Sequence, residues 1–442
     1  MSDVAATPRR ILLVAYFYPP LNSIGSRRPA ALARWLRRRG HDVTVLTSLQ
    51  SGIAADDAAL GVVRTRDLLA TRLNWRGDSL KAATGGSDAA WDPDRHLWGS
   101  IVIPDIQLVS WAPFAAVAAR RLHAKRSFDV VITTSPVESV HAVGLALRRE
   151  GVPWIADMRD GWRFEAPRED WPLAWQRRVD GQLERLALAR ADEVVMVTEP
   201  LSADLRRRLG CRVETITNGF DPEDPDARVN MDAPVDERKL TLAHTGGLGR
   251  VQSLDPLLEA LARIARDDPS LPERVELVLA GQRTAEQQAL HARPEYAPFI
   301  RHVGFVSRPE ALAIQRAADV LVLVTSGARV GEATGKLFEY LAVRRPILLF
   351  GTGNAAAEIV TGTSAGIAIP VNDPDTAEAA LRRILAEGLP EPPPDAAAPY
   401  AYPALVERYE QVIERAIAAR SGDQRRPGGR TRSADSAPAV AT

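Results

Sequence analysis

The sequence holds little of what would point to a disulfide framework, a structural metal or a nucleic-acid partner. Its 442 residues include one cysteine, Cys211, which excludes an internal disulfide and a cysteine-rich metal site. The seven histidines form no cluster in the sequence that would indicate a metal. The 56 basic residues are matched by 56 acidic ones, so charge gives no reason to expect nucleic-acid binding.

Long apolar runs are also missing. No segment reaches the roughly 18 consecutive apolar residues of a membrane-spanning helix. Arg9 and Arg10 precede an apolar run over residues 11–18, but Pro19 and Pro20 end this run and no small-residue cleavage site follows. We interpret the run as a first strand rather than a signal peptide, and we expect a cytoplasmic protein.

One predicted helix is compatible with contact to a membrane surface. Residues 29–39 carry several arginines together with Trp35. A basic helix with an aromatic residue can lie on anionic lipid, which would make the protein peripheral at the inner membrane face. A solvated helix face in an arginine-rich protein is the alternative that we favour.

The remaining composition is typical of a globular protein with two domains. Hydrophobic residues make up 45% and charged residues 25% of a chain that is too long for one ordinary core. A strand over residues 11–17, a loop over 19–28, a helix over 29–39 and a strand over 42–47 are the typical opening of a doubly wound parallel sheet. The same order restarts at Leu240. We predict an α/β protein of two doubly wound, Rossmann-like domains that face a central cleft.

Polar, turn-rich residues 218–225 separate the two halves. We place the first domain at residues 1–221 and the second at residues 222–398. Residues 421–442 are poor in large apolar side chains, so we expect a disordered tail there.

Residues 334–342 carry the most specific signal. Apolar runs over residues 320–324 and 347–350 flank them, which predicts a short helix between two parallel strands. Lys336 and Glu339 are three residues apart and share a face near the positive end of this helix. A lysine at a helix N-terminus suits a phosphate, and a carboxylate one turn later suits the two hydroxyls of a ribose. The pattern indicates a nucleotide diphosphate.

The carboxylate half of this signal has an ordinary alternative. Glu339 could be a solvated surface carboxylate. Only four of the 56 basic residues are lysines, and one of these four stands at this helix start. The scarcity of lysine favours a function for Lys336.

Two glycine-rich loops follow predicted strands, one in each half. Gly247 and Arg250 belong to the second loop, and Gly25 and Ser26 belong to the first. Glycine lets the backbone approach a phosphate closely, and arginine adds charged donors. A plain tight turn is the alternative for each loop.

A charged motif lies at the carboxyl end of the predicted strand 153–157. Asp157, Arg159 and Asp160 would reach the edge of the sheet where ligands bind in doubly wound proteins. The functional interpretation is contact with sugar or acceptor hydroxyls, and the alternative is an internal ion pair. His244 ends another strand and is most simply explained as a core histidine.

Together these motifs resemble family 4 glycosyltransferases, which have the GT-B fold. The closest branch acts in surface-polysaccharide or natural-product glycosylation. The resemblance covers residues 11–419, and four segments carry it: residues 16–27, 157–162, 218–221 and 335–342.

The resemblance implies a retaining, metal-independent enzyme that needs no cofactor. It would move a sugar from a nucleotide diphosphate sugar to a glycan, lipid-linked or small-molecule acceptor. Glu339 would hold the ribose, Arg250 and Lys336 would meet the diphosphate, and Phe305 and Val306 would line the base pocket.

The resemblance also implies that residues 399–420, with a final helix over 405–419, cross back onto the first domain. The candidate catalytic residues are Asp157, Arg159 and Asp160. The candidate donor-binding residues are Gly25, Ser26, Gly247, Arg250, Phe305, Val306, Gly335, Lys336 and Glu339.

The sequence departs from the family pattern at two places. The family has two glutamates eight residues apart, but Gly331 stands eight before Glu339 and Glu332 is one place off. The lysine expected after Arg250 is replaced by Gln252 and Ser253. A nucleotide-sugar epimerase of the same fold and a non-catalytic sugar-nucleotide-binding protein are therefore kept as alternatives.

Overall fold

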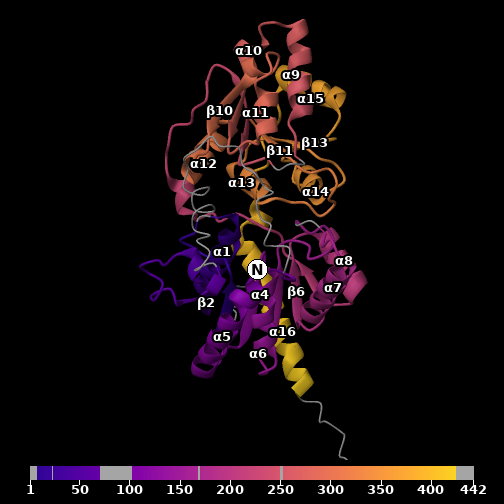
Figure 1. Cartoon of the computed structure of the whole chain (residues 1–442). Helices are drawn as coiled ribbons and strands as arrows, with labels where there is room; N and C mark the ends of the chain where they lie inside the picture. The colour runs from indigo at the N-terminus through magenta and orange to yellow at the C-terminus, as the bar shows by residue number, and fades with distance from the viewer. Residues whose placement is uncertain (1–6, 22, 70–101, 168–169, 249–251, 425–442) are drawn as a thin grey trace, which may run out of the picture.

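The computed structural model describes residues 7–21, 23–69, 102–167, 170–248 and 252–424. These residues form two α/β domains that lie one above the other, the first coloured indigo to magenta and the second mostly orange (Figure 1). The prediction of two doubly wound domains is confirmed, because each domain is built on its own parallel sheet.

The first sheet has seven strands. They are β1 (Arg10–Ala15), β2 (Asp42–Ser48), β3 (Val62–Thr65), β4 (Val130–Thr134), β5 (Trp154–Met158), β6 (Glu193–Met196) and β7 (Val213–Thr215). Their order across the sheet is β3-β2-β1-β4-β5-β6-β7. The central strand β1 is buried on both faces, since Ile11 to Val14 are all fully inaccessible, as expected when helices cover both sides of a parallel sheet.

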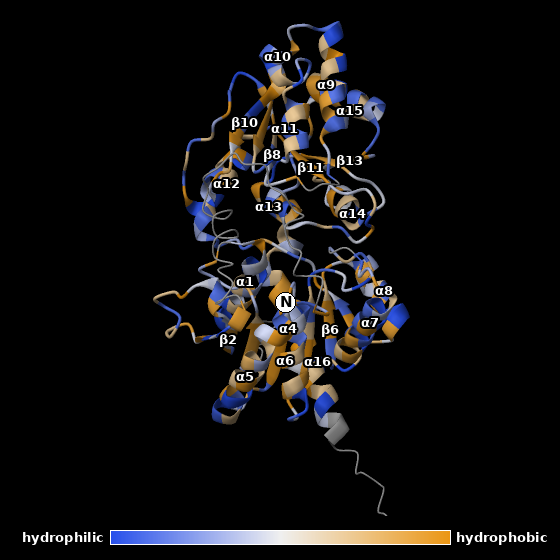
Figure 2. Cartoon of the chain, in the orientation of Figure 1, coloured by the Kyte–Doolittle hydropathy of each residue, from blue (hydrophilic) through white to orange (hydrophobic). Residues whose placement is uncertain are grey.

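Helices cover both faces of this sheet. On one face lie α5 (Ala112–Arg126), α6 (His141–Arg148), α7 (Ala174–Leu188) and α8 (Glu199–Leu209), preceded by the short α4 (Gln107–Ser110). On the other face lie α1 (Ile24–Arg38) and α16 (Tyr402–Gln424). Figure 2 shows hydrophobic strands inside this domain and hydrophilic residues along its helices.

The second sheet has six strands. They are β8 (Leu240–Thr245), β9 (Val275–Ala280), β10 (Ile300–Gly304), β11 (Val320–Val324), β12 (Ile347–Phe350) and β13 (Gly366–Ile369), in the order β10-β9-β8-β11-β12-β13. One face packs on α9 (Asp255–Asp267) and α15 (Pro374–Glu387). The other packs on α12 (Arg308–Ala317), α13 (Gly335–Val343) and α14 (Ala355–Gly362). The short helices α10 (Leu271–Arg274) and α11 (Ala285–His291) connect strands.

The final helix α16 lies on the first domain. Leu405, Tyr409 and Val412 are buried in the core that α1 also forms. The helix begins at Tyr402, three residues earlier than expected, and continues to Gln424, five residues later than expected. The expected start of a disordered tail at residue 421 is therefore wrong, and residues 425–442 lie outside the described residues.

Three other local predictions are corrected. The expected loop over residues 19–28 ends early, because α1 begins at Ile24 and contains Pro29. Residues 50–69 contain the strand β3, which the sequence did not predict, and residues 70–101 lie outside the described residues. The helices α11, α12 and α14 were also not predicted.

The arginines of α1 are engaged within the chain. Arg34 and Arg38 form ion pairs with Asp221 and Glu223, and Arg37 donates to the carbonyls of Val43 and Leu60. Because these arginines have partners within the chain, they give no reason to expect contact with anionic lipid. Within the described ranges, no helix combines the length and the apolarity that a membrane crossing needs.

Candidate functional site

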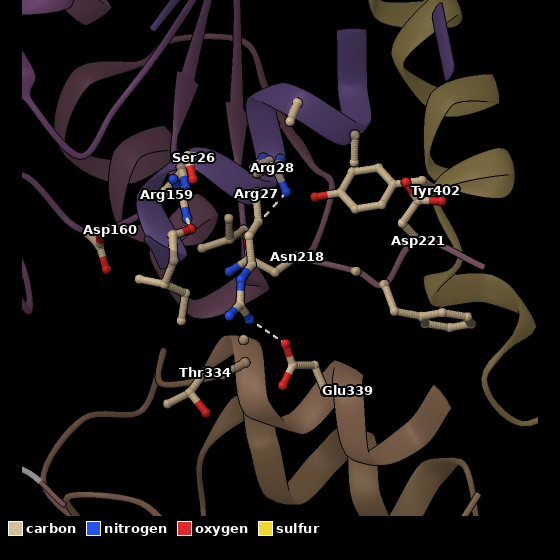
Figure 3. A pocket seen from close by; sticks show the side chains of 18 of the residues that line it. Ser26, Arg27, Arg28, Arg159, Asp160, Asn218, Asp221, Thr334, Glu339 and Tyr402 are labelled. Atoms are coloured by element: carbon tan, nitrogen blue, oxygen red, sulfur yellow. Dashed lines mark hydrogen bonds and ion pairs between the residues drawn. The ribbon is translucent and has the colours of Figure 1, made fainter. Parts of the chain in front are cut away.

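A cavity of about 690 Å³ lies between the two domains (Figure 3). The first domain contributes the start of α1 and residues 159–165, and the second contributes residues 331–335 and Glu339. Residues 218–221, which lead from one domain to the other, form another part of the wall. The cleft therefore stands where the carboxyl ends of both sheets face each other.

The helix α13 supplies the second domain's part of the site. Its residues Leu337, Phe338 and Leu341 are buried in the core, as expected for one face of a helix. Thr334 and Gly335, where the helix begins, line the cavity, and the N–H of Leu337 donates to the carbonyl oxygen of Thr334 at 3.1 Å. Across the cleft stands Ile24, whose Cδ1 would lie 3.1 Å from a Cβ placed on Gly335. The N-termini of α1 and α13 thus oppose each other, and both present positive potential to the cleft.

Glu339 is not a solvated carboxylate. Its side chain is 16% exposed and forms ion pairs with Arg27 of the first domain and Arg308 of the second. The dashed line in Figure 3 marks the pair with Arg27, which spans the cleft. A ribose that binds Glu339 must therefore share it with these arginines or displace one of them.

Lys336 lies in the first turn of α13 but points away from the cavity. Its Nζ donates to the carbonyl oxygen of Gly247 at 2.9 Å and lies 3.3 Å from Nε2 of His244. Burial lowers the pKa of Lys336 to about 8, although Glu339 and Glu332 oppose the shift. A lysine with this pKa carries its charge at neutral pH and loses it under mildly alkaline conditions.

His244 orients this lysine. Its Nδ1 lies 2.9 Å from the carbonyl oxygen of Val322, so Nδ1 carries the proton and Nε2 accepts from Lys336. Burial, followed by the nearby lysine charge, lowers the pKa of His244 to about 3. His244 is thus a neutral core histidine. Gly246, at φ +99°, leaves the space that the lysine occupies, because a Cβ there would lie 2.6 Å from Cε of Lys336.

The predicted loop residues of the second domain are placed only in part. Gly247 uses its carbonyl oxygen to hold Lys336. Arg250 lies outside the described residues, and so do Gly249 and Val251.

Asp157, a predicted catalytic residue, is locked in the core of the first domain. It is fully inaccessible, and its carboxylate accepts hydrogen bonds from Nη2 and Nε of Arg28 at 2.9 and 3.1 Å. The hydroxyls of Thr134 and Tyr409 each donate to it at 2.6 Å. Burial alone would raise the pKa of Asp157, but Arg28 and the two hydroxyls lower it overall. Asp157 joins α1, β4 and α16, and its assignment as a catalytic residue is wrong.

Arg159 supports the start of α1. Pro29 has no N–H, so it cannot make the helical hydrogen bond to the carbonyl oxygen of Gly25. Arg159 donates to this oxygen from Nη1 at 2.7 Å and to that of Ile24 from Nη2 at 2.9 Å. The guanidinium therefore replaces the hydrogen bond that the proline removes. Arg159 also lines the cavity, and its catalytic role stays a prediction.

Ser26 is also committed to the helix start. Its hydroxyl donates to the carbonyl oxygens of Leu21 and Ser23, and the side chain is buried. Gly25 is packed against Phe17, since a Cβ at this position would lie 2.9 Å from the ring. These two residues shape the N-terminus of α1, and a donor would meet the turn through its backbone.

Asp160, like Arg159, is a predicted catalytic residue that lines the cavity. Burial raises the pKa of Asp160, while the charges of Arg159 and Arg329 oppose the shift. In Figure 3 its carboxylate stands apart from the Arg27–Glu339 pair.

Comparison with known proteins identifies the architecture around this cleft. Residues 25–219 match the family model described as a glycosyl transferase 4-like domain, and residues 239–387 match the model described as glycosyl transferases group 1. The two matches span most of the chain, one in each domain. The chain belongs to the family 4-like glycosyltransferases.

A curated relative agrees with this assignment, and two solved structures share the fold. D-inositol 3-phosphate glycosyltransferase of Geodermatophilus obscurus is 27% identical over 218 residues, 48% of this chain and 47% of the relative, so the alignment spans about half of each protein. Sucrose-phosphate synthase from Thermosynechococcus elongatus has a TM-score of 0.59 and 18% identity, with 94% of this chain and 98% of that chain covered. A glycosyltransferase from Rickettsia africae has a TM-score of 0.61 and 12% identity, with coverages of 93% and 99%. The structural likeness confirms the GT-B fold.

The glycosyltransferase departs from the predicted base pocket. Phe305 is 51% exposed, Val306 packs against the core beside α13, and neither lines the cavity. Arg308 does line it and binds both Asp224 and Glu339. The capping pattern of Ser307 and Glu310 would have placed Arg308 at the start of α12 and next to the cleft.

Two further cavity residues of the glycosyltransferase were not predicted. Arg27 directly precedes the buried Arg28, and nothing in the sequence separates their roles. Glu165 follows the charged motif in a loop and reaches the second domain.

Proposed function

We propose that this glycosyltransferase moves a sugar from a nucleotide diphosphate sugar to a glycan, lipid-linked or small-molecule acceptor. The observation that carries the proposal is the start of α13, where Gly335 and, one turn later, Glu339 line the cleft between the domains. Helix N–H groups with a nearby lysine suit the diphosphate, and the carboxylate suits the ribose diol.

The diphosphate is the leaving group in this proposal. Negative charge grows on it as the bond to the sugar breaks. The opposed N-termini of α1 and α13, with Lys336 behind the turn, provide fixed positive potential for this charge. This arrangement supports the metal-independent transfer that the family resemblance implies.

Retention of the anomeric configuration is part of the same proposal and rests on the resemblance. The acceptor would enter from the first domain, where Asp160 lines the cavity. Arg329 of the second domain lines the same cavity and acts on the charge of Asp160. The curated relative makes D-inositol 3-phosphate a reasonable first acceptor to test. We also propose a cytoplasmic location.

A transfer assay tests the proposal. Purified protein is incubated with UDP-, GDP-, ADP- and dTDP-sugars, with and without D-inositol 3-phosphate and simple glycosides, in the presence and absence of EDTA. We expect release of the nucleoside diphosphate that depends on an acceptor and survives EDTA, and a product whose anomeric configuration, read by NMR, equals that of the donor.

Other outcomes would overturn the proposal. An epimerase would change the sugar of the donor without any acceptor. A binding protein would shift its melting temperature with a nucleotide sugar but would convert nothing.

A further inference from the structure

One glycine of the second domain is held by three residues of the first. The N–H of Gly331 donates to Oε2 of Glu165 at 2.8 Å, and the N–H of Val330 donates to Oε1 at 2.7 Å. The hydroxyl of Thr198 donates to the carbonyl oxygen of Gly331 at 3.0 Å. Leu201 packs against its Cα. The backbone around Gly331 is therefore bound across the domain interface on both sides.

No side chain fits at this position. A Cβ on Gly331 would lie 2.7 Å from Cγ of Leu201 and 2.9 Å from Oε2 of Glu165. The neighbouring Glu332 also lines the cavity, but its Oε2 is engaged within the second domain, where it accepts from the N–H and hydroxyl of Ser326 at 2.9 and 2.6 Å. The loop before α13 thus offers no carboxylate of its own at Gly331, and the carboxylate that occupies this place belongs to Glu165.

The loop that carries Glu165 is built to hold it there. Glu165 has φ +53°, a left-handed conformation that strains a residue with a side chain and is concentrated at ligand clamps. Gly161 allows the loop to fold on itself, since a Cβ there would lie 1.7 Å from the carbonyl oxygen of Phe164. Trp162 anchors the loop in the core and donates from Nε1 to Asp180 at 3.0 Å.

The position of Glu165 along the cleft indicates what it meets. Glu339 stands where the proposed ribose binds, and Gly335 stands one turn earlier at the diphosphate. Gly331 and Glu165 line the same cavity as Gly335 and Glu339. The next chemical group of a nucleotide sugar after the diphosphate is the sugar itself. Each oxygen of Glu165 accepts one backbone N–H and has a lone pair left for a hydroxyl.

We propose that Glu165 is a specificity-determining residue for the donor, and that the first domain presents its carboxylate to a hydroxyl of the transferred sugar. This inference rests on the proposed function. It makes sugar recognition depend on the docking of Gly331, because the same contact fixes the carboxylate and joins the two domains.

The test compares ligands with and without the sugar. Calorimetry measures the affinities of UDP, GDP, ADP and dTDP and of their glucose, galactose and mannose conjugates for the wild-type protein, Glu165→Gln and the exposed control Glu387→Gln. For the nucleotide that binds, we expect Glu165→Gln to weaken the sugar conjugate roughly ten- to hundredfold, as for loss of a charged hydrogen bond, with less than about twofold effect on the free diphosphate. Glu387→Gln should change neither.

A second variant keeps the test independent of one substitution. Gly331→Ala pushes against the carboxylate and Leu201, so it should produce the same selective loss, with a melting curve that shows a folded protein. Equal weakening of diphosphate and conjugate would make Glu165 a domain clamp only and would overturn the proposal, as would unchanged affinity for both. Failure of the wild-type protein to bind any of these nucleotides would instead refute the proposed function itself.

Discussion

We predict that Lys336 makes the affinity for a nucleoside diphosphate depend on pH between about 7 and 9. Its pKa is lowered from 10.5 to about 8, chiefly by burial. In the free protein the protonated fraction is about nine tenths at pH 7 and about one tenth at pH 9. A bound phosphate raises the pKa of the lysine, so only the protonated protein binds well. The affinity should therefore fall about tenfold from pH 7 to pH 9.

Calorimetry of diphosphate binding at several pH values between 7 and 9 measures this effect. The diphosphate is already fully charged over most of this range, because its last proton leaves near pH 6. The control is Lys336→Met, which should bind weakly and with no pH dependence. The two proteins should approach each other at pH 9. Parallel pH profiles for wild type and Lys336→Met would show that Lys336 only supports Gly247 and does not act on the phosphate.

The same pKa predicts a stability effect of defined sign. The folded protein holds this proton less tightly than the unfolded chain, so the unfolded state binds more protons between pH 8 and 10.5. Stability should therefore rise with pH across this window, and the cost of the buried charge is fully present below pH 8. Lys336→Met should accordingly melt at a higher temperature than wild type at pH 7, as read by a thermal scan, while it loses diphosphate affinity.

Three further substitutions test the assigned roles. Glu339→Gln should weaken nucleotide binding roughly ten- to hundredfold but should matter far less for a 2′,3′-dideoxy nucleotide, and equal losses in calorimetry would remove the ribose assignment. Asp157→Asn should lower the free energy of unfolding by about 3–5 kcal/mol, because Arg28 would be left as a buried charge without its partner; a denaturation midpoint like that of wild type would contradict this reading. Arg250→Ala should weaken diphosphate binding by about 1.5–3 kcal/mol with an unchanged melting curve, and unaltered affinity would mean that its loop is only a turn.

The fold could be predicted from the sequence because the patterns that indicate its strands and helices lie within short segments. A strand that is buried on both faces must be a continuous apolar run, and the run from Val320 to Val324 marks β11 at its observed bounds. The helix after it was also placed correctly, since Lys336 and Glu339 lie in its first turns. Pro29 misled the prediction, because α1 contains this proline, and the carbonyl of Gly25 that it leaves without a helical donor accepts from the distant Arg159.

The roles of the site residues depend on partners far away in the chain. Asp157 has the sequence environment of a catalytic carboxylate, yet Tyr409, 252 residues later, helps to enclose it. Glu339 was predicted to face a ribose, but its arginine partner Arg27 lies 312 residues earlier and on the other domain. Packing between distant segments decides which charged side chains reach solvent or ligand, and periodicity carries no information about it.

Because α16 completes the core of the first domain, the two domains cannot mature in the order in which they are synthesised. The first sheet ends at Thr215, but Leu405, Tyr409 and Val412 cover one of its faces. The second domain has its last helix by Glu387. On the ribosome the second domain can therefore finish folding while the first still exposes an apolar face and holds Arg28 and Asp157 without the hydroxyl of Tyr409. The usual sequence of events, in which the N-terminal domain folds first, is reversed here. Until α16 has been synthesised, the incompletely folded first domain is the part of the nascent chain that needs protection from aggregation.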